Sequence, residues 1–348
     1  MKIAGIACAF PSRKVSNKEV LQLIRERSEA DFEGDLNHAL QQVEFFLTYI
    51  GINHRRWLST TDNAFQYTEQ AVSEALDRAQ LNRSDIDLLI HASVDKRVVE
   101  PGMSFFMAKA LGMDNVQCFD VTEACGSWTR ATQIAQQYLD AGLLRNVMII
   151  TAEYAQHEDQ HVARGMTLQN TAELEWAFAG YTVGEGSTAT VLTRDDSTPW
   201  HYRNRTFTQL ADLCMCPIDD YNPQVMQMGD VSLAGKGNGR FSSYGKKMQD
   251  QTLPHVIEMM RDNIVPVEDV DLFIPHTQTL TAWREVEQAL DKKINYQFLL
   301  PEYGNLVNNS IPSGIALAEQ EGRLKRGDKV AAMMTAAGMS FTLYNFVY

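Results

Sequence analysis

Cys125 lies on a predicted turn between a strand and a helix. The segment VTEACGSWTRATQIA, residues 121–135, changes there from an apolar, β-branched run to a helical pattern. A thiol at the first turn of a helix faces unpaired backbone N–H groups and the positive end of the helix dipole, and both favour the thiolate. Because cysteine is also a common small core residue, the position alone favours a nucleophile no more strongly than a packing role.

Two polar residues farther along the chain could supply the partners of a nucleophilic thiol. Acyl transfer to a thiol requires donors for the carbonyl oxygen and a group that moves protons or stabilises an enolate. His276 ends an apolar run in LFIPHTQT, and Asn305 follows a turn in EYGNLVNN. A lone histidine is usually a satisfied polar residue, and an asparagine after glycine is usually a turn former. The assignment therefore depends on whether both residues lie beside Cys125.

The alternation of strands and helices predicts a layered α/β fold that could bring these residues together. We expect strands at residues 86–92, 116–121 and 147–151, and helices at 31–49, 101–111 and 126–141.

One pattern of the chain occurs twice. SDIDLLIHAS at residue 84 resembles EDVDLFIPHT at residue 268, with Asp85 matching Asp269, and RNVMIITAEY is echoed by DKVAAMMTAA. Two copies are too few for a solenoid, so the recurrence predicts two pseudo-symmetric halves in one fused body. We place the boundary among the turn formers at 195–199, which leaves Cys125 in residues 1–195 and His276 and Asn305 in residues 196–348.

Composition limits the class of partner. The chain has 348 residues, 45% of them hydrophobic, and a net charge of −13, so a generally cationic surface for nucleic acid or anionic lipid is not expected. We find no apolar run of about 18 residues and no signal-peptide pattern in residues 1–10, which predicts a cytoplasmic protein without membrane contact. The five scattered cysteines argue against a disulfide framework.

These residues belong to motifs that resemble those of the β-ketoacyl-acyl-carrier-protein synthase III (synthase III) family of the thiolase superfamily. The resemblance extends over nearly the full length of the chain. Each motif is weak alone, but the ordered set is specific. The motifs are Phe10-Pro11, GINHRR at Gly51, EACGSW around Cys125, ARG ending near Arg164, GEGSTATVL at Gly184, IPHTQ around His276, YGNLVNNSIPSGIALAE at Gly304, and TAAGMSF at Thr335.

The resemblance implies a thiolase-like fold of two βαβαβαββ halves in a five-layered αβαβα sandwich, paired as a homodimer or with a related subunit. It implies that Cys125 takes an acyl group from acyl-coenzyme A or an acyl-carrier protein, with no tightly bound cofactor and no metal. His276 and Asn305 would hold the carbonyl of a malonyl-type thioester for decarboxylative Claisen condensation. The backbone N–H of Cys125, with that of Gly338 or Met339, would form the oxyanion hole.

Two carboxylates depart from the family pattern near the expected acyl pocket. Glu123 stands where the family has a small residue, and it would raise the thiol pKa unless it is paired or turned away. A buried salt bridge or a dimer contact is an equally good interpretation of Glu123. Glu100 stands where the family carries an apolar residue that reaches across the dimer, and a charge there disfavours a short alkyl primer.

The expected coenzyme A entrance is only partly kept. Arg164 and Phe45 match an adenine-stacking pair, but Tyr49 replaces a basic phosphate contact and Ser242 replaces a pantetheine-binding asparagine. A carrier-protein arm is therefore a credible donor, and its acidic carrier could dock on basic residues. The candidate basic residues are His54, Arg55, Arg56, Lys236, Arg240, Lys246 and Lys247. Together these departures favour specialised, fatty-acid- or polyketide-like secondary metabolism.

Three other functions remain open. Some proteins with this fold move acyl groups onto oxygen or nitrogen, although retention of His276 and Asn305 favours condensation. HEDQH at residues 157–161 matches a zinc hydrolase pattern, with Glu173, Glu175 or Glu185 as a third ligand, but its flanks lack the apolar face that such a helix needs. A scaffold subunit of a heteromeric synthase is the third alternative, and the presence of Cys125 argues against it.

Overall fold

The first sheet of the protein has five strands in the order β1-β7-β6-β4-β5. The computed structural model describes residues 1–156, 160–195, 199–216 and 239–348. β7 pairs antiparallel with both β1 and β6, while β6, β4 and β5 are parallel. The LLIHA segment of β4 is buried throughout because helices cover both faces of the sheet. The strands are β1 (Lys2–Ala9), β4 (Leu88–Ala92), β5 (Gln117–Val121), β6 (Asn146–Glu153) and β7 (Gly186–Thr193).

The second sheet repeats this topology. Its described strands follow the order β8-β13-β12-β11, with β13 antiparallel to both β8 and β12, and β12 parallel to β11. Where the first sheet continues into β5, Phe273 of β11 makes a single parallel bridge to Tyr296. The strands are β8 (His201–Thr206), β11 (Leu272–Pro275), β12 (Lys329–Ala336) and β13 (Ser340–Val347).

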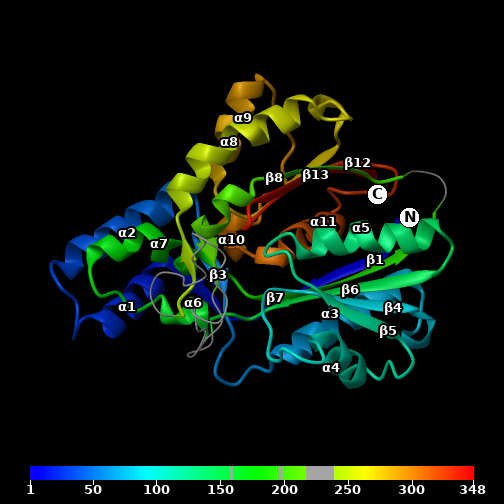
Figure 1. Cartoon of the computed structure of the whole chain (residues 1–348), viewed down its shortest axis with the longest axis horizontal. Helices are drawn as coiled ribbons and strands as arrows, with labels where there is room; N and C mark the ends of the chain where they lie inside the picture. The colour runs from blue at the N-terminus through cyan, green and yellow to red at the C-terminus, as the bar shows by residue number, and fades with distance from the viewer. Residues whose placement is uncertain (157–159, 196–198, 217–238) are drawn as a thin grey trace.

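Helices separate and cover the two sheets, as Figure 1 shows. Helices α5 (Ser127–Asp140) and α11 (Ser310–Gln320) lie between the sheets, and their apolar residues form one core cluster with both of them. The outer helices are α3 (Ala64–Ala79) and α4 (Met103–Ala110) on the first sheet, and α8 (Gly245–Arg261) and α9 (Leu280–Leu290) on the second. The predicted five-layered αβαβα sandwich is confirmed. The boundary predicted at 195–199 includes residues 196–198, which lie outside the described residues, and it stays a prediction.

A helical extension lies at one end of the sandwich (Figure 1). The apolar stripe of α2 packs there against α1, and Leu40, Val43 and Leu47 are buried as the predicted amphipathic helix requires. The extension contains α1 (Asn17–Ser28), α2 (Leu36–Ile50), α6 (His161–Arg164), α7 (Leu174–Ala177) and α10 (Leu300–Tyr303). The short strands are β2 (Lys14–Ser16), β3 (His54–Arg56), β9 (Cys214–Met215) and β10 (Ser242–Ser243). Among the described helices, none is long and apolar enough to cross a bilayer.

The predicted strands and helices are present, and their ends differ by a few residues. The helix expected at 101–111 begins at Met103, because Gly102 has a φ of 128° and cannot belong to a right-handed helix. The Asp120 carboxylate of β5 accepts hydrogen bonds from the backbone N–H groups of Met103 and Ser104. A side chain from another element thus fixes where α4 starts.

A second pair of aspartates in the repeated segments, Asp87 and Asp271, has the same role in both halves. Just before β4, Asp87 Oδ2 accepts hydrogen bonds from the N–H groups of Arg145 (2.7 Å) and Asn146 (3.0 Å) at the start of β6. Just before β11, Asp271 Oδ2 accepts a 2.8 Å bond from the N–H of Lys329 at the start of β12. Each carboxylate therefore sets the register of one pair of parallel strands.

We predict that Asp87→Ala lowers the free energy of unfolding by about 1–2 kcal/mol and Asp271→Ala by about 1 kcal/mol, because each change leaves backbone donors without a charged acceptor. Urea denaturation followed by circular dichroism measures the loss. Asp77→Ala, on the exposed face of α3, is the control and should change stability by less than about 0.5 kcal/mol. Wild-type midpoints for both variants would contradict the register role.

Candidate active site

Cys125 sits in a tight turn between β5 and α5, which we call the Cys125 turn (residues 122–126). Ala124 has a φ of 45°, an uncommon conformation for a residue with a side chain. Ser127 closes the turn, because its Oγ accepts a 2.8 Å hydrogen bond from the Glu123 N–H and donates one to the Ala124 carbonyl. A Cβ at Gly126 would lie 3.3 Å from the Ala336 Cβ, so the turn approaches the end of β12 closely.

The thiol of Cys125 is protonated at rest. Burial raises the pKa of this thiol well above its usual range, and the nearby Cys214 and the Glu153 carboxylate raise it further. The thiolate expected from the helix dipole is therefore wrong for the unliganded site: removing the sulfur from water costs more than the helix N-terminus offsets.

His276 directly follows β11 and is buried, with 2% of its surface exposed. Its backbone N–H donates to the Met333 carbonyl at 2.9 Å, which holds it against β12. Its Nδ1 is 3.0 Å from Ser310 Oγ, and among the described residues Nε2 has no hydrogen-bond partner. Burial lowers the pKa of His276 to about 3, so the imidazole is neutral at physiological pH.

Asn305 is held by backbone contacts with the first half of the chain. Its N–H donates to the Thr182 carbonyl at 2.8 Å, and its carbonyl accepts the Gly184 N–H at 2.9 Å. Its side-chain Oδ1 accepts the Val307 N–H at 3.0 Å and the Thr277 hydroxyl at 3.4 Å. The amide nitrogen Nδ2 has no partner within the described part of the chain, so it is available as a donor.

Two hydroxyls join His276 to Asn305. Thr277 Oγ1 lies 2.7 Å from Ser310 Oγ and also contacts Asn305 Oδ1, so the four side chains form one hydrogen-bonded row. Sequence reasoning missed Thr277 and Ser310. Their adjacency to the IPHT and NNS motifs was the available signal, but a hydroxyl's partner across about 30 positions of chain is set only by folding.

The Cys125 turn reaches the same loop from the other side. The Trp128 N–H, at the start of α5, points to Asn308 Oδ1 at 3.4 Å, and Asn308 Nδ2 donates to the buried Glu153 carboxylate at 2.8 Å. Burial raises the pKa of Glu153 to about 7. The loop that contains Asn305 and Asn308 thus contacts the nucleophile's helix at one end and His276, through Ser310, at the other.

Motif glycines allow this convergence. A Cβ at Gly184 would lie 2.0 Å from the Tyr303 carbonyl oxygen, and one at Gly304 would lie 2.5 Å from the Thr182 carbonyl oxygen. Neither approach leaves room for a side chain. The GEGSTATVL and YGN motifs are therefore pressed together, backbone to backbone, across the two halves.

The predicted second donor of the oxyanion hole lies in the β12–β13 turn (residues 337–339). Gly338 has a φ of 113°, Met339 is buried, and Ala336 pairs with Ser340 across the turn. Because Gly126 packs against Ala336, this turn neighbours the Cys125 turn.

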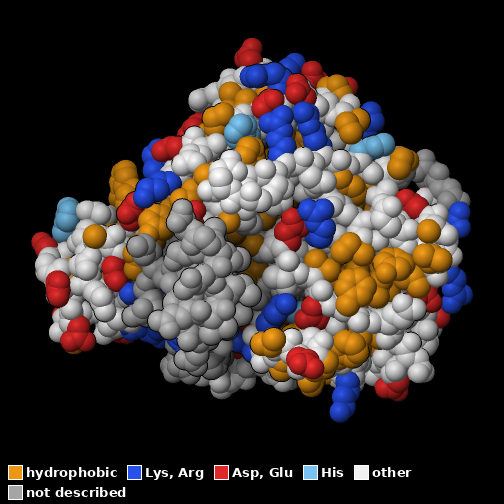
Figure 2. All heavy atoms as spheres, viewed as in Figure 1, with side chains coloured by type: hydrophobic (Ala, Val, Ile, Leu, Met, Phe, Trp, Pro, Cys, Tyr) orange, Lys and Arg blue, Asp and Glu red, His pale blue; other side chains and the backbone are white. Residues whose placement is uncertain are grey.

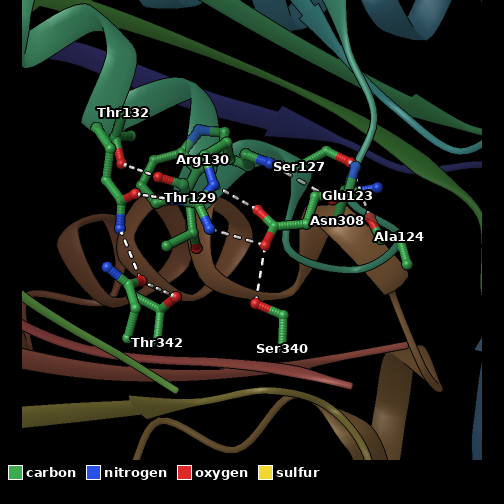
Figure 3. Close-up of polar contacts among 12 residues, drawn as sticks. Glu123, Ala124, Ser127, Thr129, Arg130, Thr132, Asn308, Ser340 and Thr342 are labelled. Atoms are coloured by element: carbon green, nitrogen blue, oxygen red, sulfur yellow. Dashed lines mark hydrogen bonds and ion pairs between the residues drawn. The ribbon is translucent and has the colours of Figure 1, made fainter. Parts of the chain in front are cut away.

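The two carboxylates that depart from the family pattern have different surroundings. Glu123 pairs with Arg130 and accepts a hydrogen bond from Ser340, as Figure 3 shows, so it offers no free carboxylate to a substrate pocket. The expected salt bridge is present, and the dimer contact stays a prediction. Glu100 is exposed beside Val99, which is 92% exposed, and its place at an acyl pocket stays a prediction.

Two of the four expected coenzyme A contacts share a groove, and the coenzyme A role of all four stays a prediction. Phe45 and Tyr49 line an open groove between α2 and α8. Where these helices meet, Figure 2 shows hydrophobic and basic side chains together at the surface. Arg164 and Ser242 are not among the lining residues, and Ser242 is buried, with its hydroxyl directed to the Arg240 carbonyl.

The basic residues proposed for carrier docking are not one surface either. Arg55 is fully buried, where it donates to Asn17, and burial lowers its pKa to about 10. Arg240 is paired with Glu173. Lys246 and Lys247 are exposed, and Lys236 lies outside the described residues. Acidic and basic side chains are interspersed over the face in Figure 2.

The HEDQH pattern receives no support from its surroundings. His157, Glu158 and Asp159 lie outside the described residues. The possible third ligands have other partners: Glu173 binds Arg240, Glu175 binds Lys247, and Glu185 accepts the N–H groups of Leu58 and Gln156. Among the described residues, no group of three His, Cys, Asp or Glu is arranged to hold a metal ion.

We predict that alkylation of Cys125 by iodoacetamide rises about tenfold per pH unit and reaches no plateau up to pH 9, because only the thiolate reacts and burial keeps its pKa high. Peptide mass mapping after timed alkylation measures the rate, with a short cysteine peptide as the control for reagent chemistry. A plateau below pH 7 would show that the helix dipole outweighs burial.

Comparison with known proteins agrees with this geometry. The family model described as 3-oxoacyl-[acyl-carrier-protein (ACP)] synthase III matches residues 119–168, which include Cys125. The model described as 3-oxoacyl-[acyl-carrier-protein (ACP)] synthase III C terminal matches residues 260–345, which include His276, Asn305 and Gly338.

Curated relatives match nearly the full length of the chain. The β-ketoacyl-[acyl-carrier-protein] synthase III of Campylobacter jejuni is 27% identical over 344 residues, covering 94% of this chain and 95% of its own. That of Helicobacter pylori is 26% identical over 358 residues, covering 97% and 96%. The predicted enzyme class, an acyltransferase, agrees with these names.

Solved structures share the fold. Xanthomonas campestris OleA with bound lauric acid and lauroyl-CoA superposes with a TM-score of 0.79 at 20% identity, covering 99% of this chain and 98% of that one. The 3-oxoacyl-[acyl-carrier-protein] synthase III of Aquifex aeolicus gives 0.77 at 21% identity, covering 100% and 99%. The chain is thus similar to β-ketoacyl-acyl-carrier-protein synthase III proteins over nearly its full length, and it has their thiolase-like fold.

Proposed function

We propose that the chain is an acyltransferase of the ketosynthase III type, in which Cys125 is acylated and the acyl group is then joined to a malonyl-type thioester. One observation carries this proposal. Among the described residues, His276 Nε2 and Asn305 Nδ2 have no hydrogen-bond partner and can both donate, and Thr277 and Ser310 hold the two side chains in one row. Two fixed donors suit one carbonyl oxygen that becomes an enolate oxygen.

In the first step, the Cys125 sulfur attacks the carbonyl carbon of an acyl thioester, and the donor's thiol leaves. The resting thiol must lose its proton during this attack, and the neutral imidazole of His276 speeds that transfer without being required for it, because water can also take the proton to the departing thiol. The N–H groups of Cys125 and of Gly338 or Met339 would stabilise the oxyanion. The released proton ends on the departing thiol.

In the second step, the carbonyl oxygen of the malonyl-type unit accepts hydrogen bonds from His276 and Asn305. Loss of carbon dioxide places negative charge on that oxygen. The two hydrogen bonds to the enolate oxygen are then stronger than those to the ground-state carbonyl. The enolate carbon then attacks the acyl group, and the Cys125 sulfur leaves as thiolate and regains a proton.

The row of hydroxyls serves both steps. Ser310 Oγ can donate to His276 Nδ1, or accept from it while donating to the Val307 carbonyl at 2.7 Å. Either tautomer of the imidazole is therefore satisfied. His276 can be a base at Nε2 in the first step and a donor at Nε2 in the second.

The substrate is an acyl thioester, with no tightly bound cofactor. OleA, which shares the fold, was solved with lauroyl-CoA, and this supports an acyl-CoA donor here. The exposed aromatic residues Phe45 and Tyr49 in the α2–α8 groove would contact the donor's nucleotide or pantetheine. A carrier-protein donor is the other source of the same thioester, and the specialised, polyketide-like pathway stays part of this proposal.

The pairing of two subunits is also a proposal. β5 is the edge strand of the first sheet, and apolar side chains near it are exposed, among them Val99, Phe105 and Phe106. An identical or related subunit that covered this edge would bury them. Glu100, in the same exposed loop, would then reach the partner's acyl pocket, where its charge would select against short alkyl primers.

We predict that wild-type protein incubated with a panel of acyl-CoA and acyl-carrier donors gains the mass of one acyl group at Cys125, and that Cys125→Ala gains none. His276→Ala should retain a measurable acyl adduct but lose condensation with malonyl thioester, because the enolate loses one of its two donors. Intact mass spectrometry and product analysis measure the two half-reactions separately. A 3-oxo product distinguishes condensation from ester or amide formation, and equal loss of both half-reactions would contradict the assigned roles.

Removal of the groove aromatics should weaken donor binding without slowing the chemistry. We predict that Phe45→Ala and Tyr49→Ala each raise KM for acyl-CoA by about 2- to 10-fold with kcat nearly unchanged, as expected for loss of about 0.5–1.5 kcal/mol of aromatic stacking. Leu143→Ala, an exposed apolar residue just beyond α5, is the control. Wild-type KM in both aromatic variants would exclude this groove as the entrance.

A further inference from the structure

Glu123 is a carboxylate two residues before the nucleophile, where it could repel a thiolate, and its partners explain how the site accommodates it. Arg130, at the end of the first turn of α5, binds it through two hydrogen bonds: Nε to Oε2 at 2.7 Å and Nη2 to Oε1 at 2.9 Å. The ion pair is partly buried, with the two side chains 23% and 35% exposed. The bidentate geometry balances the charge of Glu123 and fixes its orientation.

Glu123 also contacts the other half of the chain. Ser340, the first residue of β13, donates its hydroxyl to Glu123 Oε1 at 2.8 Å, as Figure 3 shows. Ser340 pairs with Ala336 across the β12–β13 turn, and Ala336 packs against Gly126 of the Cys125 turn. The two strand ends that flank the β12–β13 turn are therefore both attached to the Cys125 turn.

A layer of polar side chains links Arg130 to the second sheet. Arg130 Nη1 donates to Gln133 Oε1, Gln133 Nε2 donates to Asn204 of β8 at 3.1 Å, and Thr342 of β13 also donates to Asn204 at 2.7 Å. This layer joins α5 to the second sheet; its member that contacts Arg130 is Gln133, and Thr342 contacts neither Arg130 nor Glu123. Glu123 is the member of this network that belongs to the Cys125 turn itself.

We propose that the Glu123–Arg130–Ser340 bridge is a positioning device for the oxyanion hole: it holds the β12–β13 turn at the distance from Cys125 at which N–H groups from both turns reach one oxygen. Glu123 acts through Ser340 and does not touch the substrate. A charged acceptor holds the Ser340 hydroxyl more strongly than a neutral one, and a small displacement of an oxyanion donor is costly to acyl transfer. The inference rests on the proposed function, since it concerns the same thioester chemistry.

Two reactions of Cys125 separate positioning from general damage. Acylation by a thioester develops an oxyanion, whereas alkylation by iodoacetamide displaces iodide and develops none. We expect Ser340→Ala and Glu123→Ala to lower the rate of acylation at least tenfold while the rate of alkylation changes less than about twofold, because removal of one oxyanion donor costs about 10²–10³ and a displaced donor loses part of that. Glu123→Gln keeps an acceptor for Ser340 and should restore part of the acylation rate.

Thr342→Val is the matched control, since it deletes a hydroxyl from the same strand and polar layer without touching Glu123. The ratio of its acylation rate to its alkylation rate should equal that of the wild type. If Ser340→Ala and Glu123→Ala also keep the wild-type ratio, the bridge does not position the oxyanion hole. A variant that alkylates at the wild-type rate has retained its local fold. Its acylation rate therefore tests the bridge even if the overall stability of the variant is lower.

Hydrogen–deuterium exchange gives a second readout that needs no acyl donor. The peptide spanning residues 334–342 should exchange faster in Ser340→Ala and Glu123→Ala than in the wild type and Thr342→Val. If the wild type accepts no acyl group from any thioester, the proposed function fails, and exchange alone then decides whether the bridge holds the turn. Unchanged exchange in both bridge variants would overturn the inference whatever the result for acylation.

Discussion

The site depends on the close backbone contact between residues 182–184 of the first half and residues 303–305 of the second. Asn305 is fixed there by hydrogen bonds to Thr182 and Gly184, and carbonyl oxygens occupy the space that side chains on Gly184 and Gly304 would need. A larger residue at either glycine would force the halves apart. Because the two sheets share one topology, this contact brings chemically different loops from equivalent strand ends to one place.

Burial sets the charge states of the titratable groups at this site. The pKa of His276 falls to about 3 and the pKa of the Cys125 thiol rises, so neither group is charged at rest. A neutral imidazole keeps both of its roles, as an acceptor or a donor at Nε2, and the Ser310 hydroxyl satisfies Nδ1 in either case. The arrangement stabilises charge only when a reaction creates it, which is the property that distinguishes transition-state from ground-state stabilisation.

Glu123 shows how a charged side chain near such a site can have a structural role. Its carboxylate is fully engaged by Arg130 and Ser340, and these contacts connect the Cys125 turn to the strand that follows the β12–β13 turn. The ion pair lies at the junction of the two halves, where partial burial strengthens it and its two hydrogen bonds to Arg130 define one geometry. A residue that seems adverse by type is thus accommodated by its partners.

The sequence by itself determined the layered fold, the internal repeat and the choice of Cys125, His276 and Asn305, because these follow from local patterns: residues at strand ends, glycines in turns and aspartates before strands. The tertiary structure decided the rest. Ser310 and Arg130 were missed because a hydroxyl or guanidinium has many possible partners until the chain folds, Arg55 proved buried although its sequence neighbours are polar, and the expected thiolate proved to be a thiol. Partners, burial and pKa depend on distances between segments far apart in the chain, and only the packing of the two halves sets those distances.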